Sequence, residues 1–244
     1  MESASPDTFR AWVRQARHIA VLTGAGISAE SGVPTFRDAQ TGYWAQFRPE
    51  DMATEAGFRA HPQRVWDWYL YRRELLAGAV PNAGHRALAA FQQQFPGRLT
   101  LITQNVDGLH ERAGSTGVLC LHGDIFEDRW LDMPRHCCHI EHAVAGRPPY
   151  CDRCGNLLRP GVVWFGEALP FRTLEAAQQA AQACDLMLVV GTAGAVYPAA
   201  GLAHQARAAG ARVVVVNPAP SELDGTAHAV LRAPAAQVLP TLLG

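Results

Sequence analysis

Short, continuously apolar runs alternate with longer amphipathic stretches along this chain. Four of the apolar runs are predicted strands: Ile19–Leu22, Leu99–Thr103, Asp185–Val190 and Arg212–Val216. Helices are expected over about 6–17, 62–77, 82–94, 174–183, 199–209 and 235–243. Strands that are apolar throughout and alternate with helices are typical of a parallel sheet covered on both faces. The pattern therefore predicts an α/β fold.

The alternation breaks down between Glu127 and Pro160, where cysteine, histidine and proline gather. This stretch is predicted to be a small module inserted into the α/β fold. The chain has no internal repeat and no low-complexity tract.

Small or polar residues follow all four predicted strands, at Gly24–Ser28, Gln104–Asp107, Gly191–Thr192 and Asn217. Each of them alone fits an ordinary turn after a strand. In open α/β sheets, however, ligands bind beyond the carboxyl ends of the strands. The four strand ends together therefore predict a ligand site at that edge.

The first strand leads into a Gly-x-Gly-x-x-Ala segment that begins at Gly24. Glycines there let a pyrophosphate approach the backbone, and the following helical turn offers its positive end. Gly32 and Pro34 are expected to break that helix after about two turns, and a Thr-Phe-Arg-Asp loop follows. The cofactor end of the site is typical of NAD, whereas the substrate end is unlike that of a dehydrogenase.

Composition narrows the class of protein. The chain has 244 residues, 48% of them hydrophobic, and a net charge of −1, so no basic footprint for nucleic acid is expected. No apolar run approaches about 18 residues and no signal peptide is evident, so we expect a cytoplasmic protein that does not bind membranes. All 21 basic residues are arginine.

Several motifs in this sequence resemble those of the sirtuins, the NAD-dependent protein lysine deacylases. They are Gly24-Ala25-Gly26-Ile27-Ser28, Thr35-Phe36-Arg37, Thr103 to His110, Leu121-His122-Gly123, Val162 to Glu167 and Gly191-Thr192. The resemblance covers nearly the whole chain. It implies a Rossmann-like part at about 1–36, 82–122 and 163–244. It also implies a small zinc-type and helical domain at about 37–81 and 123–162.

The resemblance further implies a role for each matching residue. The expected NAD-binding residues are Gly24, Ala25, Gly26, Ser28, Thr35, Phe36, Arg37, Gln104, Asn105, Asp107, Gly191, Thr192, Ala193, Asn217 and Ala235. Ala193 stands where the family usually has serine, so weaker NAD binding is expected. His122 matches the general base, and Val163 and Phe165 match the edge that binds the acylated lysine peptide. The implied products are nicotinamide and O-acyl-ADP-ribose.

Two other histidines compete with His122 for a catalytic role. His85 opens a predicted helix, and the structural role is favoured for it. His110 belongs to the Asp107–His110 motif and is expected to stabilise that loop.

Tyr69 and Arg72 lie three residues apart, and so on one face of the predicted helix. They fit an ordinary amphipathic helix. They also resemble the Tyr-x-x-Arg pair of sirtuins that accept succinyl- and malonyl-lysine, and Ala39 matches the wider acyl pocket of that class. An arginine fork and a phenol suit a terminal carboxylate. Removal of acetyl groups is not excluded by this pair.

The predicted metal module departs from the family pattern. Cys151 and Cys154 form one Cys-x-x-Cys, but Trp130 and Met133 occupy the positions expected for the other. Because adjacent cysteines rarely chelate one tetrahedral ion together, we expect Cys138 with a neighbouring histidine to complete a structural zinc site. A degenerate module without metal is the alternative.

Two other functions remain open at this point. An ADP-ribosyltransferase would cleave the same glycosidic bond of NAD but pass ADP-ribose to a protein. A non-catalytic NAD-binding module is the third possibility, and the presence of His122 argues against it. The two segments that could flank a bound peptide, Val163–Glu167 and Gly194–Tyr197, favour the deacylase.

Overall fold

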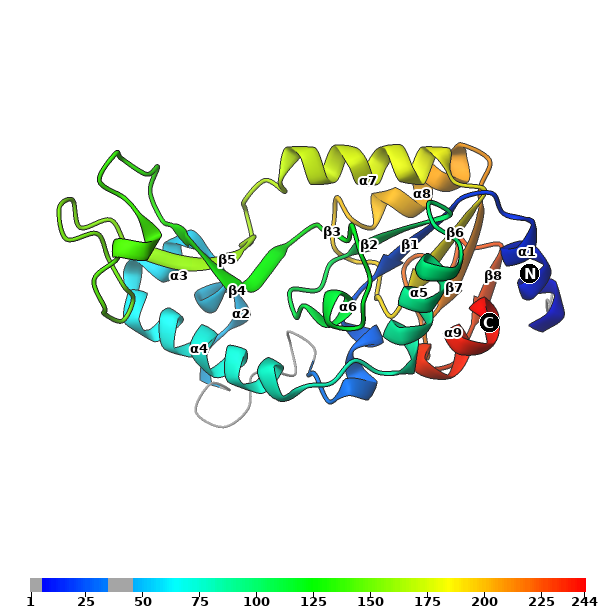
Figure 1. The fold of residues 1–244 in the computed structure, drawn as a ribbon, viewed down its shortest axis with the longest axis horizontal. Coiled ribbons are helices and arrows are strands. Elements are labelled where there is room, and N and C mark those ends of the chain that lie inside the picture. Colours follow the sequence, from blue (N-terminus) through cyan, green and yellow to red (C-terminus); the bar gives the residue numbers. More distant parts are fainter. Residues whose placement is uncertain (1–5, 35–45) are drawn as a thin grey trace.

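The computed structural model describes residues 6–34 and 46–244, and in it a six-stranded parallel sheet forms the larger part of the molecule (Figure 1). The strand order is β3-β2-β1-β6-β7-β8. Their bounds are β1 Ile19–Thr23, β2 Leu99–Thr103, β3 Leu119–Cys120, β6 Leu186–Val190, β7 Arg212–Val216 and β8 Ala229–Leu231. The predicted α/β class with a Rossmann-like sheet is confirmed.

Helices cover both faces of this sheet, and the strands alternate their side chains between them. In β1, Ile19 and Val21 join the apolar cluster under α1 (Pro6–Gln15), α5 (Ala83–Gln94) and α9 (Ala235–Leu243). Its residues Ala20 and Leu22 join the opposite cluster under α7 (Phe171–Ala183) and α8 (Gly201–Ala208). Burying a side chain the size of Val, Leu or Ile contributes about 1.5–3 kcal/mol. This two-sided core explains why the strands are apolar throughout.

The structure differs from the sequence prediction in three places. Strands β3 and β8 span only 2 and 3 residues, too few to show a hydrophobic period. The helix α7 begins at Phe171, three residues earlier than the apolar pattern indicates. The predicted helix after Gly24 is instead a pair of 3₁₀ turns, η1 Ala25–Ile27 and η2 Ala29–Ser31. Gly32 ends the second turn with a φ of +76°, which favours glycine.

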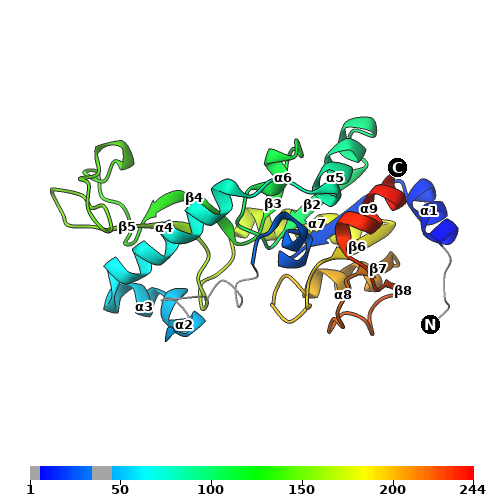
Figure 2. The same cartoon turned by 90° about the horizontal axis from the view of Figure 1, so that it is seen from below.

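A second, smaller group of elements lies at the other end of the molecule (Figures 1 and 2). It consists of α2 Pro49–Met52, α3 Glu55–Ala60, α4 Pro62–Gly78, and the antiparallel pair β4 Gly123–Trp130 and β5 Leu158–Val162. Its separate core includes Phe58, Trp68, Tyr69, Ile125 and Trp164. The domain boundaries given above stay a prediction. The short helix α6 Leu109–Arg112 and the turn η4 Ile140–His142 complete the described elements.

Arginine ties α4 to the β4 strand. The Arg73 guanidinium donates to the Ile125 carbonyl at 2.5 Å and pairs with the Asp128 carboxylate at 2.6 Å. Both side chains of this ion pair are largely buried. Because the sequence has no lysine, the side chain with a permanent positive charge in such ion pairs of the described residues is arginine.

Within residues 6–34 and 46–244, the helices are all too short or too polar to cross a bilayer.

Candidate active site

The candidate site lies where β1 separates its two neighbours, β2 and β6. Residues Thr23, Thr103 and Val190 are in register at the ends of these three strands. The segments that follow them therefore meet at one edge, which is where open α/β sheets bind ligands.

Very close backbone contact joins the glycine loop after β1 to the end of β6. Gly24 N–H donates to Val190 O at 3.0 Å, and Gly26 N–H donates to Gly191 O at 2.7 Å. A Cβ atom on Gly26 would lie 2.8 Å from Gly191 Cα. The glycines are therefore required for this contact. Because their own amides bind β6, other groups of the loop must supply the donors for a phosphate.

Ser28 connects this loop to the segment after β2. Its hydroxyl donates to Asp107 Oδ2 at 2.7 Å and accepts from Asn105 Nδ2 at 3.2 Å. Asn105 Nδ2 also donates to Gly24 O at 3.2 Å. Ser28 and Asp107 are buried, so the polar groups of three predicted NAD-binding residues hold one another in place.

The other predicted NAD residues that the structure describes lie at neighbouring strand and helix ends. Gln104 Nε2 donates to Thr192 Oγ1 at 3.3 Å, which links β2 to β6. Ala193 is exposed just beyond, and its carbonyl accepts from Glu222 N–H at 2.8 Å. Asn217 follows β7 and donates from Nδ2 to Ala219 O at 2.8 Å. Ala235 opens α9, whose next amide donates to the Glu30 carboxylate beside the glycine loop at 2.8 Å.

His122 lies between β3 and β4, at the junction of the two groups of elements. Its Nδ1 lies 2.9 Å from Gln104 O, and a carbonyl can only accept a hydrogen bond. Nδ1 therefore carries the proton, and Nε2 of the neutral ring has a lone pair. Burial lowers the pKa of His122, while the Gln104 hydrogen bond opposes the change.

His85 and His110 are buried, and their ring centroids lie 4.8 Å apart. Burial lowers the pKa of His85 to about 4 and that of His110 to about 3. His85 takes part in a capping box with Asn82 at the start of α5. His110 Nε2 lies 3.0 Å from Thr23 Oγ1. Both histidines thus hold site elements together as neutral rings, in agreement with the structural roles expected for them.

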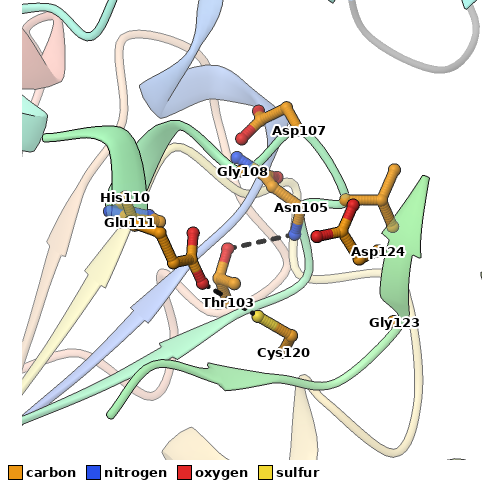
Figure 3. Close-up of a pocket in the computed structure, with 10 residues that line it drawn as sticks. Thr103, Asn105, Asp107, Gly108, His110, Glu111, Cys120, Gly123 and Asp124 are labelled. Atoms are coloured by element: carbon orange, nitrogen blue, oxygen red, sulfur yellow. Dashed lines mark hydrogen bonds between the residues drawn. The ribbon is translucent and has the colours of Figure 1, made fainter. Parts of the chain in front are cut away.

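Figure 3 shows a small cavity behind the predicted NAD-binding segment, between that segment and β3 and β4. Its volume is about 10 Å³, which suits roughly one water molecule. Asn105 N–H donates to Thr103 Oγ1 at 3.0 Å, and the Cys120 thiol donates to Glu111 Oε1 at 3.3 Å (Figure 3). This cavity is much too small for a nucleotide.

Tyr69 and Arg72 lie on α4 with their side chains together. Tyr69 is buried, and its hydroxyl accepts from Trp164 Nε1 at 3.0 Å. The Arg72 guanidinium lies 4.9 Å from the Trp68 ring centroid and 5.7 Å from that of Tyr69. Burial lowers the pKa of Arg72, and Tyr69 and the Asp107 charge oppose this change. The pair is therefore within electrostatic reach of the segment after β2.

Val163 and Phe165 lie next to His122. Val163 N–H donates to the His122 carbonyl at 2.8 Å, and Phe165 N–H donates to Ala53 O at 2.9 Å. The Phe165 side chain is 53% exposed, whereas that of Trp164 between them is buried. Tyr197, in the other segment expected to flank the peptide, is 63% exposed. Four predicted site residues, Thr35, Phe36, Arg37 and Ala39, lie outside the described residues.

Four cysteines form the candidate metal centre: Cys137, Cys138, Cys151 and Cys154, with their sulfurs all within 4.8 Å of one another. Four sulfurs around zinc at 2.3 Å would lie about 3.8 Å apart, so the cluster fits a structural zinc. The adjacent Cys137 and Cys138 both belong to this cluster, whereas the sequence predicts a histidine beside Cys138. The turn that carries them is closed by Cys138 N–H, which donates to Arg135 O at 2.8 Å. Which of these side chains bind an ion stays a prediction.

The chemistry of these thiols also suits a metal. Burial opposes ionisation of Cys151, but backbone amides of Cys154 and Arg153 lower its pKa to about 7. A thiolate is the form that binds zinc. Met133 is 89% exposed, so it does not pack the module as the metal-free alternative requires.

Comparison with known proteins agrees with this architecture. The Sir2 family pattern matches residues 24–198, and the chain belongs to this family. A protein of Ralstonia nicotianae named NAD-dependent protein deacylase is 55% identical, over 99% of this chain and 97% of its own length. A relative of the same name from Mycolicibacterium paratuberculosis is 51% identical, over 92% and 96%.

Two solved structures are also similar. A Sir2 homologue in complex with NAD is 40% identical, with a TM-score of 0.87 over 97% of this chain and 92% of that one. A Sir2 protein bound to an acetylated peptide is 29% identical, with a TM-score of 0.84 over 97% and 96%.

Zinc content should depend on the cysteine cluster. We expect about one zinc per chain by elemental analysis after purification without chelator, and Cys151→Ser should lose it and unfold the module, because structural zinc supplies folding energy. Cys120→Ser, outside the cluster, is the matched control. Less than about one tenth of an equivalent in the unmodified protein would contradict a zinc site.

Proposed function

We propose that this chain is an NAD-dependent protein-lysine deacylase in which His122 is the general base. The observation that carries the proposal is the placement of His122. Its ring is held by the Gln104 carbonyl at 2.9 Å, and its own carbonyl holds Val163 of the proposed peptide edge at 2.8 Å. The names of the two relatives, at 55% and 51% identity, support the same activity.

The donor set beyond the strands suits NAD. Gln104, Asn105 and Asn217 provide amides and Asp107 provides a carboxylate, which are groups that pair with ribose hydroxyls and a carboxamide. We propose that they hold these parts of the cofactor, with Gly24, Ala25, Gly26 and Ser28 around the pyrophosphate. Gly191, Thr192, Ala193 and Ala235 would complete the nucleotide side. When bound, NAD would supply the ribose carbon at which the acyl oxygen forms a bond while the bond to nicotinamide breaks and nicotinamide leaves.

His122 would take the proton of a ribose hydroxyl at Nε2. The Gln104 carbonyl fixes the tautomer that leaves this nitrogen unprotonated, and burial keeps the ring neutral. No reorientation of the ring is then required before proton transfer.

The exposed Phe165 and the backbone of Val163 would bind the peptide as an added strand, with the acylated lysine entering beside His122. That a similar Sir2 structure is bound to an acetylated peptide supports a peptide substrate.

We further propose that succinyl- and malonyl-lysine are among the substrates. Support comes from the buried Tyr69 and the half-buried Arg72, whose side chains lie together, with the pKa of Arg72 sensitive to the Asp107 charge. A phenol and a guanidinium would bind the terminal carboxylate of such an acyl group, and acetyl-lysine would use the same lysine channel without them.

His122→Ala should leave NAD binding nearly intact and lower deacylation by a factor on the order of 10² or more, as expected for loss of a general base. Product formation from an acyl-lysine peptide can be followed by mass spectrometry, with NAD affinity measured separately. His61→Ala, at an exposed position, is the control. Retention of most activity would remove His122 from this role.

The acidic limb of the pH–activity profile should lie at a low pH. Because burial lowers the His122 pKa, the base stays neutral as pH falls past the ordinary value of about 6.5. Activity should decline only as pH falls through the lowered pKa, where the ring becomes protonated. The measurement is kcat/KM against pH with a saturating concentration of NAD. A limb centred above about 6.5 would contradict the tautomer and burial argument.

Arg72→Met and Tyr69→Phe should raise KM for succinyl-lysine peptides far more than for acetyl-lysine peptides. A buried carboxylate loses roughly 2–5 kcal/mol when its charged partner is removed, and acetyl has no carboxylate. Arg72 should matter more, since it provides the charge and two donors. If the succinyl-to-acetyl ratio of kcat/KM is unchanged in Arg72→Met, the carboxylate pocket is wrong while the deacylase proposal stands.

A further inference from the structure

The indole of Trp164 lies directly behind Tyr69. Trp164 is 2% exposed, and its Nε1–H donates to the Tyr69 hydroxyl oxygen at 3.0 Å. Its neighbour Phe165, in contrast, is 53% exposed. Trp164 therefore connects the proposed peptide edge with the proposed acyl pocket.

A phenol oxygen can accept a hydrogen bond and also donate its own proton. In Tyr69 the accepting side is used by Trp164, and within the described chain no acceptor receives the O–H. Tyr69 is 2% exposed, so this donor is held in a buried setting. Burial raises the pKa of Tyr69 against the opposing effects of Arg72 and Trp164, so the phenol keeps its proton near neutral pH.

Two charged side chains hold Trp164 in place, one through its ring and one through its backbone N–H. The Arg159 guanidinium, which is 2% exposed, lies 3.2 Å from the indole ring centroid. Arg159 pairs with Glu167, and Glu167 Oε2 accepts from the Trp164 backbone N–H at 2.8 Å. Arg159 Nη2 also donates to Val162 O at 2.8 Å. The Arg159 guanidinium against the ring and the Glu167 carboxylate on the backbone N–H therefore fix the direction of the indole N–H.

We propose that Trp164 is a positioning residue for acyl specificity: its indole N–H occupies the accepting side of the Tyr69 hydroxyl and directs the O–H toward a carboxylate at the end of the acyl chain. The inference rests on the carboxylate pocket proposed above and adds the residue that orients it. Trp164 reaches this carboxylate only through Tyr69.

The test is a double-mutant cycle with Trp164→Phe and Tyr69→Phe. The measured quantity is kcat/KM for succinyl- and acetyl-lysine forms of one peptide. Trp164→Phe should lower the succinyl-to-acetyl ratio roughly five- to tenfold, mostly through KM for the succinyl peptide, as expected for one misdirected hydrogen bond. In the Tyr69→Phe background it should have no further effect on the ratio, because the hydroxyl is already gone.

Trp66→Phe is the matched control. Trp66 is also buried on α4, but its ring lies 5.4 Å from the Arg73 guanidinium and it makes no hydrogen bond to Tyr69. The ratio should stay unchanged in this variant. Equal losses for both peptides in Trp164→Phe, or additive losses in the double variant, would show a packing role and overturn the inference.

Arg72→Met separates the two proposals. If it lowers the ratio and Trp164→Phe does not, the inference fails and the carboxylate pocket stands. If Arg72→Met leaves the ratio unchanged, both fail together.

A spectroscopic measurement covers the case in which Trp164→Phe does not fold. Among the indole N–H signals of the 6 tryptophans in an NMR spectrum, Tyr69→Phe should move one most strongly. In the unmodified protein, a saturating succinyl-lysine peptide should shift that signal and the acetyl-lysine peptide should not. If the chemical shift of that signal does not change when the succinyl-lysine peptide binds, the inference is overturned.

Discussion

The contact between the glycine loop and the end of β6 is the constraint on which the site depends. Gly26 N–H reaches Gly191 O at 2.7 Å, and a Cβ on Gly191 would lie 2.3 Å from Ile27 N. Gly191 has a φ of +63°, so both the space and the backbone conformation require glycine. This contact fixes the turn that carries Ser28 under the segment after β2. Ser28 in turn binds Asp107 at 2.7 Å, so the polar groups proposed to bind the nucleotide hold one another in place without it.

The two groups of elements meet at His122, through its side chain on one side and its backbone carbonyl on the other. The imidazole is hydrogen-bonded to the segment after β2, and the carbonyl of the same residue bonds Val163 beyond β5. The proposed base is thus held by the larger part on one side and by the peptide edge on the other. Its half-buried neutral ring and the proposed donor set for NAD are complementary parts of one proposed reaction.

Much of the fold could be predicted from the sequence because the information is local. The strand ending at Val216 is apolar from Val213 onward, and α9 begins at Ala235 as expected, since both follow short-range patterns. The cysteine cluster could not be predicted in full. The inclusion of Cys137 depends on a turn that no periodicity reveals. Likewise, the hydrogen bond from Trp164 to Tyr69 joins residues 95 positions apart, and only the folded chain places them together.

The reliance on arginine has a consequence for the protein itself. The pairs of Arg73 with Asp128 and Arg159 with Glu167 hold the small group of elements together. Acylation neutralises a lysine amine, whereas a guanidinium stays charged. Reactive metabolites that acylate lysines throughout a proteome therefore find no side-chain amine in this chain. The arginine charges in these ion pairs therefore stay the same however heavily the lysines of surrounding proteins are acylated.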